Sequence, residues 1–215
     1  MATISTQDLS QLPGVAKLEA LLQSLAMLEA ILCPEWEYRY YSFNAKWGKG
    51  ERMGSMRNGS GDEFFALFNK YGCFLKGYEH ECQFAKRPEL GSQLYEGVPQ
   101  PLKGGVTEPA FSPENVTFCL WRAADGSHWE HADFKLPKGK DPDGSAYLLS
   151  HLDGNPETYC QFAEEYYEVE VDPEIVAAIY EHQPLTKPMA TGLNADADWK
   201  DIKADAKRSL TRCRA

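Results

Sequence analysis

The stretch that decides the fold is RMGSMRNGSGDEFFALFNKYGCFLKGY, residues 52–78. Its apolar and aromatic runs are separated by short segments that contain Gly, a pattern typical of consecutive antiparallel hairpins. We therefore expect strands at residues 52–58, 63–69 and 73–78. The middle run has no polar residue at either parity between Phe64 and Phe68, so this strand should be central, with both faces covered.

Helical and strand patterns flank this stretch on both sides. Leucines from Leu18 to Leu32 follow a helical spacing between Pro13 and Pro34, which predicts an amphipathic helix that packs on the sheet. A first strand is expected at residues 37–43 and a later hairpin at residues 116–122 and 128–134. Helices should follow Asp143, two of them beginning at Asn-Pro and Asp-Pro steps, and a last helix should start near Asp196.

The order of these elements predicts an α+β fold in one domain. Strands come first and helices follow, so we expect a mainly antiparallel sheet of about five to six strands, packed with the N-terminal helix and several C-terminal helices. We expect a flexible N-terminus at residues 1–12, the single domain at 13–185, and a linker with a C-terminal helical arm at 186–215. Residues 79–115 are rich in Pro and predict a long ordered loop with a helical turn or two.

Charge and composition narrow the classes of function. The chain has 32 acidic and 22 basic residues and a formal net charge of −10, which argues against nonspecific nucleic-acid binding and favours a basic partner. No signal peptide is recognisable, and no segment is apolar for the roughly 18 residues that span a bilayer. The six cysteines form no CxxC pair, so we expect a reducing, cytoplasmic location.

One loop is a candidate ligand site. The run from Arg57 to Asp62, RNGSGD, could direct several N–H groups at an anion, although it fits neither GxGxxG nor GxxxxGK[ST] and a plain hairpin turn also explains it. In the ligand interpretation Arg57 clamps an anionic group, Asp62 or His80 handles protons, and Asn58 and Arg122 complete the site.

Other chemistries lack support in the sequence. Residues 128–133 (HWEHAD) and 79–81 (EHE) contain metal-ligand types, but alternation along a strand sends them to opposite faces. No GxSxG motif is present, and the cysteines Cys73, Cys119 and Cys160 lie in apolar runs. We therefore predict no metal, no cofactor and no catalytic residue.

Amphipathic aromatics favour a protein-binding surface, because this class of side chain is enriched at interfaces. Trp47, in a turn rich in Lys and Gly, and Trp129 are the candidate partner-binding residues. The leading hypothesis is a non-enzymatic binding protein, monomeric or homodimeric, that meets a basic protein through an acidic surface. The alternative is a small-ligand-binding protein or enzyme that uses the Arg57–Asp62 loop with His80 and Arg122.

Three segments together resemble a family of uncharacterised bacterial proteins over roughly residues 35–185. They are SMRNGSGD at 55–62, FCLWR at 118–122, and DPDGS at 141–145, which continues through GNPETY at 154–159 to EEYY at 164–167. The resemblance implies a single bacterial cytoplasmic domain and assigns no activity or catalytic residue. Small acidic α+β bacterial proteins are often toxin-neutralising immunity proteins, an analogy at the level of the fold.

Overall fold

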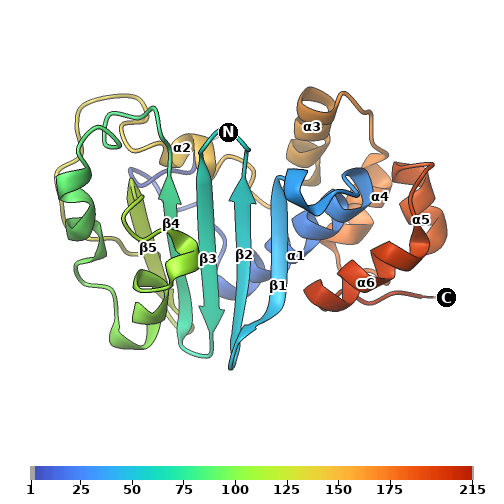
Figure 1. Cartoon of the computed structure of the whole chain (residues 1–215), viewed down its shortest axis with the longest axis horizontal. Coiled ribbons are helices and arrows are strands. Elements are labelled where there is room, and N and C mark those ends of the chain that lie inside the picture. Colours follow the sequence, from blue (N-terminus) through green and yellow to red (C-terminus); the bar gives the residue numbers. More distant parts are fainter. Residues whose placement is uncertain (1–2, 215) are drawn as a thin grey trace.

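A five-stranded antiparallel sheet forms the centre of the molecule, and its strands lie side by side in chain order (Figure 1). The computed structural model describes residues 3–214. The predicted α+β class, with one domain and a mainly antiparallel sheet, is confirmed. The strands are β1 (Tyr41–Gly48), β2 (Glu51–Arg57), β3 (Glu63–Asn69), β4 (Gly72–Tyr78) and β5 (Phe118–Ala123).

Strand β3 is the central strand that its sequence predicts. It pairs with β2 through Met56↔Phe64 and with β4 through Phe65↔Lys76, and its five inner residues are all buried. Because side chains alternate along a strand, Phe64, Ala66 and Phe68 enter one core cluster while Phe65 and Leu67 enter a second. The sheet therefore has two covered faces and two separate cores.

Helices cover the first face. Helix α1 lies against this face, and Gly54 allows its close approach, since a Cβ there would lie 2.8 Å from Leu22 Cδ1. The remaining helices follow β5, and they cluster beyond the β1 edge and behind the sheet in Figure 1. The helices are α1 (Val15–Leu32), α2 (Ser145–Leu148), α3 (Pro156–Tyr167), α4 (Pro173–Tyr180), α5 (Lys187–Leu193) and α6 (Trp199–Ser209).

The predicted helix starts are confirmed in detail. Asn155 accepts a hydrogen bond from the N–H of Glu157 at the start of α3, and Asp172 accepts one from Glu174 at the start of α4. Each is an N-cap followed by Pro at the first helical position. The last helix, expected to start near Asp196, begins at Trp199, and its N-cap Asp198 accepts from the N–H groups of Lys200 and Asp201.

A segment without strands covers the second face. The predicted loop 79–115 is ordered and contains three short 3-10 helices, seen in green and yellow-green to the left of β5 and in front of β4 and β5 in Figure 1. They bury Leu94, Leu102 and Phe111 against Phe65 and Phe74. The short helices are η2 (Pro88–Tyr95), η3 (Gln100–Val106) and η4 (Pro109–Phe111).

Two predicted strands are corrected. The sequence predicts the first strand at residues 37–43, but Trp36–Tyr38 forms a 3-10 helix and β1 begins only at Tyr41. The strand begins late because the N–H of Tyr40 donates to the Glu29 carboxylate and not to a neighbouring strand. Of the expected strand at 128–134, only Glu130 pairs, with Trp121. The neighbouring Trp129 side chain turns into the core, where its indole N–H donates to the Pro13 carbonyl at 2.9 Å.

Both ends of the chain contribute to the core. Ile4 and Leu12, in the segment 1–12 that we expected to be flexible, are buried in the helix-covered cluster, while Met1 and Ala2 lie outside the described residues. In the segment 186–215, expected to be a linker and arm, Ile202 and Ala206 of α6 are buried in that same cluster, and Ala215 lies outside the described residues.

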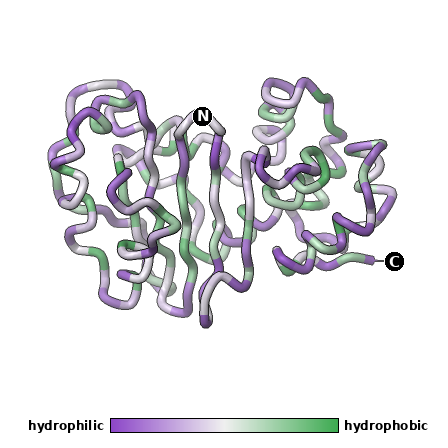
Figure 2. The backbone as a smooth tube through the Cα atoms, in the orientation of Figure 1, coloured by the Kyte–Doolittle hydropathy of each residue, from purple (hydrophilic) through white to green (hydrophobic). Residues whose placement is uncertain are grey.

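Hydrophobic residues concentrate on the strands and on the helices that face them (Figure 2). Within residues 3–214, none of the helices has the length and apolar character needed to cross a bilayer.

Candidate functional site

The loop predicted to bind a ligand is a turn that satisfies its own polar groups. The side-chain Oδ1 of Asn58 accepts from the N–H of Ser60 (2.9 Å) and of Asp62 (3.1 Å), and its Nδ2 donates to Asp62 Oδ2 (2.6 Å). Gly59 and Gly61 have φ values of 75° and 112°, which other residues rarely adopt. The plain hairpin turn that the sequence allows therefore accounts for most of RNGSGD.

Asp62 and His80 form a hydrogen-bonded pair at the end of the sheet. Asp62 Oδ1 accepts from the His80 ring Nδ1 (2.6 Å) and from the His80 backbone N–H (2.9 Å). Burial opposes ionisation of Asp62, but the hydrogen bonds from His80 and Asn58 outweigh it and lower the pKa of this carboxyl. The bond to Asp62 in turn raises the pKa of the exposed His80 imidazole.

This pair has the arrangement of an oriented base. A carboxylate that fixes one ring nitrogen leaves the other free to take a proton at the surface. The nearest charged atom that Nε2 meets is Glu81 Oε1, at 3.8 Å. Ligand-type atoms of Asp62, Glu79 and His80 also lie within 4.8 Å of one another, although a metal there would have to replace the hydrogen bond between Asp62 and His80.

The two arginines do not join this pair. The Arg57 guanidinium lies 5.2 Å from the Phe65 ring centroid, with its Nε 3.9 Å from Glu63, on the face covered by the loop. Arg122 pairs with Cys73 at the opposite end of β4, roughly 20 Å along the strand from His80, and its Nε donates to the Gly126 carbonyl. The structure thus brings together Asn58, Asp62 and His80 and separates them from both arginines.

Neither candidate tryptophan presents a free surface. Trp129 is only 5% exposed. Trp47 of β1 is half-buried. Its ring stacks on that of Phe111, which belongs to the loop that covers the second face, with the centroids 5.7 Å apart. A partner surface has to be built from other aromatics.

Two tyrosines supply such a surface. Tyr147 of α2 and Tyr166 of α3 are 48% and 44% exposed. The Tyr147 hydroxyl accepts from Asn58 Nδ2 at 3.4 Å, so it adjoins the Asp62–His80 pair. Tyr166 stacks on Phe162, with the centroids 5.2 Å apart, and meets Tyr40 edge-on at 5.1 Å. These contacts hold the Tyr166 ring in place although the residue is 44% exposed.

A carboxylate-rich segment, residues 141–186, surrounds these tyrosines in sequence. It contains eleven Asp or Glu residues and no Lys or Arg. Most of its carboxylates are exposed on α3, on α4 and on the connection between them, namely Glu157, Glu164, Glu165, Glu168, Glu170, Asp172, Glu174 and Glu181. The run of 46 residues without a basic side chain was visible in the sequence and was the signal that could have located this surface.

No protein family model, curated protein or solved structure matches the chain. The resemblance to a bacterial family stays a prediction.

Proposed function

We propose that this chain is a non-enzymatic, cytoplasmic bacterial protein that binds a basic protein partner, in the manner of an immunity protein. The partner would contact the carboxylate-rich segment, with Tyr147 and Tyr166 as aromatic anchors. We expect the chain to act as a monomer or homodimer and to bind neither nucleic acid nor membranes.

The observation that carries the proposal is the concentration of exposed carboxylates and of two exposed tyrosines within residues 141–186. The eight exposed acidic residues of the segment have no Lys or Arg neighbour in sequence to neutralise them. Such a field speeds the association of a basic protein, and tyrosine rings bury a large area with little loss of side-chain freedom. The exposed rings supply contact area and the carboxylates supply selectivity for positive charge.

Charge reversal with a matched control tests the proposal. Glu164, Glu165 and Glu168 become Lys in one variant, and Glu89, Glu96 and Asp125, which are exposed elsewhere, become Lys in the control. Each protein is used to capture partners from extracts of the source bacterium at low and at high salt. We expect the wild type and the control to retain a basic protein at low salt and the first variant to lose it. Equal capture by both variants would contradict the proposal.

A second candidate function rests on the Asp62–His80 hydrogen bond alone. An imidazole oriented by a carboxylate can act as a general base toward a small substrate. Arg57 and Arg122 are no part of this version, because neither lies beside the pair. Hydrolysis of p-nitrophenyl acetate compares the wild type with His80→Ala and with His128→Ala, a second exposed histidine. Loss of rate in the His80 variant only would support the base, and equal rates in all three would exclude it.

A further inference from the structure

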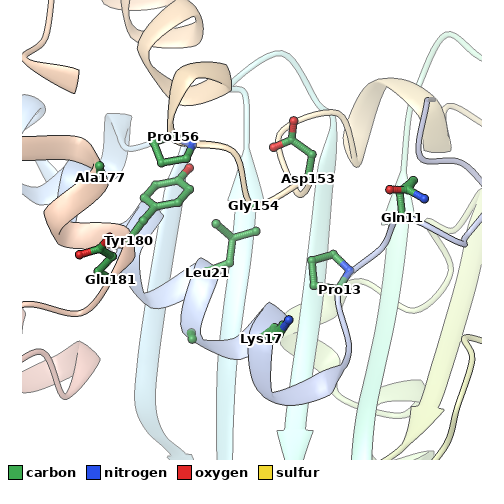
Figure 3. Close-up of a pocket in the computed structure, with 11 residues that line it drawn as sticks. Gln11, Pro13, Lys17, Leu21, Asp153, Gly154, Pro156, Ala177, Tyr180 and Glu181 are labelled. Atoms are coloured by element: carbon green, nitrogen blue, oxygen red, sulfur yellow. The ribbon is translucent and has the colours of Figure 1, made fainter. Parts of the chain in front are cut away.

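A hollow of about 610 Å³ opens between α1, α4 and the turn that precedes α3 (Figure 3). Its base is apolar, formed by Leu21 of α1, Ala177 of α4 and the rings of Pro13 and Pro156. Its volume falls within the range of sites that enclose small organic ligands. Of the eight exposed carboxylates named above for the carboxylate-rich segment, only Glu181 lines it.

The walls of the hollow are preformed. Pro156 is the first residue of α3, with φ fixed by its ring, and Asp153 holds the turn before it. Asp153 accepts from the N–H of Asn155 (2.9 Å) and from the hydroxyl of Thr158 (2.7 Å). The Asp153 carboxylate is therefore oriented by the protein and still has lone pairs free for a further donor.

The polar groups around the hollow favour a cation. Asp153 and Glu181 contribute two negative charges, against the single positive charge of the exposed Lys17. The Tyr180 hydroxyl is buried and has no hydrogen-bond partner in the part of the chain that the structure describes. Burial and the charge of Asp153 raise the pKa of Tyr180, so the hydroxyl stays neutral.

The orphaned hydroxyl belongs to the wall of this hollow. In Figure 3 the Tyr180 ring stands between Pro156 and Glu181, and its hydroxyl points toward Pro156. A buried hydroxyl that lacks a partner is unfavourable, so a donor bound in the hollow would satisfy it once the ring turns toward the open space. A guest that carries N–H groups would satisfy both this hydroxyl and the Asp153 carboxylate.

We propose that this hollow is a binding site for a small amphipathic amine, a primary ammonium group carried on a compact apolar body. The ammonium group donates to Asp153 and Tyr180 and is attracted by Glu181, while the apolar body covers Leu21, Ala177 and the two prolines. An anion of the same size is disfavoured by the two carboxylates. A second hollow of about 540 Å³ shares Gln11 and Asp153 with the first, which leaves room for a longer guest.

The test uses three probes of one shape and different charge: phenethylamine, phenylethanol and phenylacetate. Binding is followed by calorimetry and by the NMR signals of the Leu21 and Ala177 methyl groups. We expect phenethylamine to bind the wild type, phenylethanol to bind at least about tenfold more weakly, and phenylacetate not to bind. Absence of phenethylamine binding, or equal binding of the amine and the acid, would overturn the proposal.

Variants of residues in α4 and just after it distinguish binding in the hollow from binding elsewhere on the protein surface. Ala177→Leu fills the space without changing charge and should lower the affinity for phenethylamine at least about tenfold. Glu181→Gln should lower this affinity up to about fivefold, because an exposed charge contributes little. Glu174 is exposed on the same helix but outside the hollow, so Glu174→Gln should leave the affinity unchanged. Equal affinity of the wild type and Ala177→Leu, or an equal loss in the two Gln variants, would overturn the assignment.

Discussion

Among the fully buried ionisable side chains, Glu29 and Lys76 lie on opposite faces of the sheet and are stabilised in opposite ways. On the helix-covered face, Glu29 of α1 receives hydrogen bonds from the hydroxyls of Tyr159 (2.9 Å) and Tyr167 (2.5 Å) and from the N–H of Tyr40 (2.8 Å). On the loop-covered face, Lys76 of β4 donates to the carbonyl groups of Phe111 (2.5 Å), Ser112 (3.0 Å) and Asn115.

The difference follows from what covers each face. Helices satisfy their own backbone groups, so on the first face a buried carboxylate serves to connect side chains of α3 and the chain before β1 to α1. The loop has no ladder to satisfy its carbonyl groups, so on the second face an ammonium group gathers three of them. Glu29 therefore fixes the relative positions of helices, whereas Lys76 fixes a loop onto the sheet.

The largest effect is expected from Glu29→Ala. Two tyrosine hydroxyls and one backbone N–H would lose their acceptor inside the core, and each unsatisfied donor costs about 1–3 kcal/mol. Some of this loss is offset because the variant no longer buries a carboxyl group. We expect the free energy of unfolding to fall by about 3 kcal/mol in urea titrations. A loss within the error of the wild-type value would show that the helices hold their places without Glu29.

The pH dependence of stability tests the buried state of Glu29 independently of the alanine variant. Burial raises the pKa of Glu29 in the folded protein, although the three hydrogen bonds oppose this shift. The folded state then keeps the proton to higher pH than the unfolded chain does. As pH rises from about 4.3 through the folded pKa, the wild type should lose stability relative to Glu29→Gln. The opposite slope would mean that hydrogen bonding outweighs burial.

Lys76→Met should have the next largest effect. The methionine fills most of the same space but leaves three carbonyl groups without a donor, two of which can recruit water near the surface. We expect a loss of about 2 kcal/mol in the free energy of unfolding, together with faster amide exchange in residues 107–116. Exchange as slow as in the wild type would show that apolar contacts of Phe111 hold this segment without the ammonium group.

The pH dependence of Lys76 has the opposite sign to that of Glu29. Burial lowers the pKa of Lys76 to about 8, from an ordinary value near 10.5. Between these two values the unfolded chain binds more protons, so the contribution of this site to stability should rise with pH. The difference in free energy of unfolding between wild type and Lys76→Met should therefore widen from pH about 8 to about 10.5. A constant difference would contradict the lowered pKa.

Substitution of two glycines, one on each face, would show which face is packed more tightly. A Cβ at Gly105 of η3 would lie 2.2 Å from the Phe74 ring, and one at Gly54 of β2 would lie 2.8 Å from the flexible end of Leu22. Because a ring yields less than a leucine methyl, Gly105→Ala should cost about 2 kcal/mol and Gly54→Ala about 1 kcal/mol by thermal unfolding. The reverse order would mean that the loop-covered face is the more adaptable one.

The same contrast explains how much of the fold the sequence predicts. The leucine spacing of α1, the apolar runs of β2, β3 and β4 with their Gly-containing turns, and the caps at Asn155 and Asp172 are local signals, and those elements lie where the sequence predicts them. The cover of the second face depends on Lys76 meeting carbonyl groups 35 or more residues away, which no local pattern encodes. Strand β1 begins late for a similar reason, since Tyr40 bonds to Glu29 of α1.

The candidate site was predictable to a lesser degree. Asn58 and Asp62 lie in one turn, and the pairing of β3 with β4 places His80 beside them, so this group follows from the hairpins. The sequence does not encode the direction in which β5 pairs with β4, and this direction puts Arg122 at the far end of the sheet. The hollow at Tyr180 joins three segments that only tertiary packing brings together.

The smallest effect on stability is expected at the Asp62–His80 pair, at the end of the sheet. Because the bond to Asp62 raises the pKa of His80, the stability that this bond contributes is fully present below the ordinary histidine pKa of about 6.5 and is lost as pH rises through the folded pKa. NMR titration of the ring protons should show a lower His80 pKa in Asp62→Asn than in the wild type. Glu81→Gln is the matched control, because its carboxylate lies 3.8 Å from Nε2 without a hydrogen bond and should change the pKa less. A larger pKa change in Glu81→Gln than in Asp62→Asn would show that the general negative charge at this end of the sheet raises the pKa of His80. It would contradict the interpretation of the pair as a base oriented by Asp62.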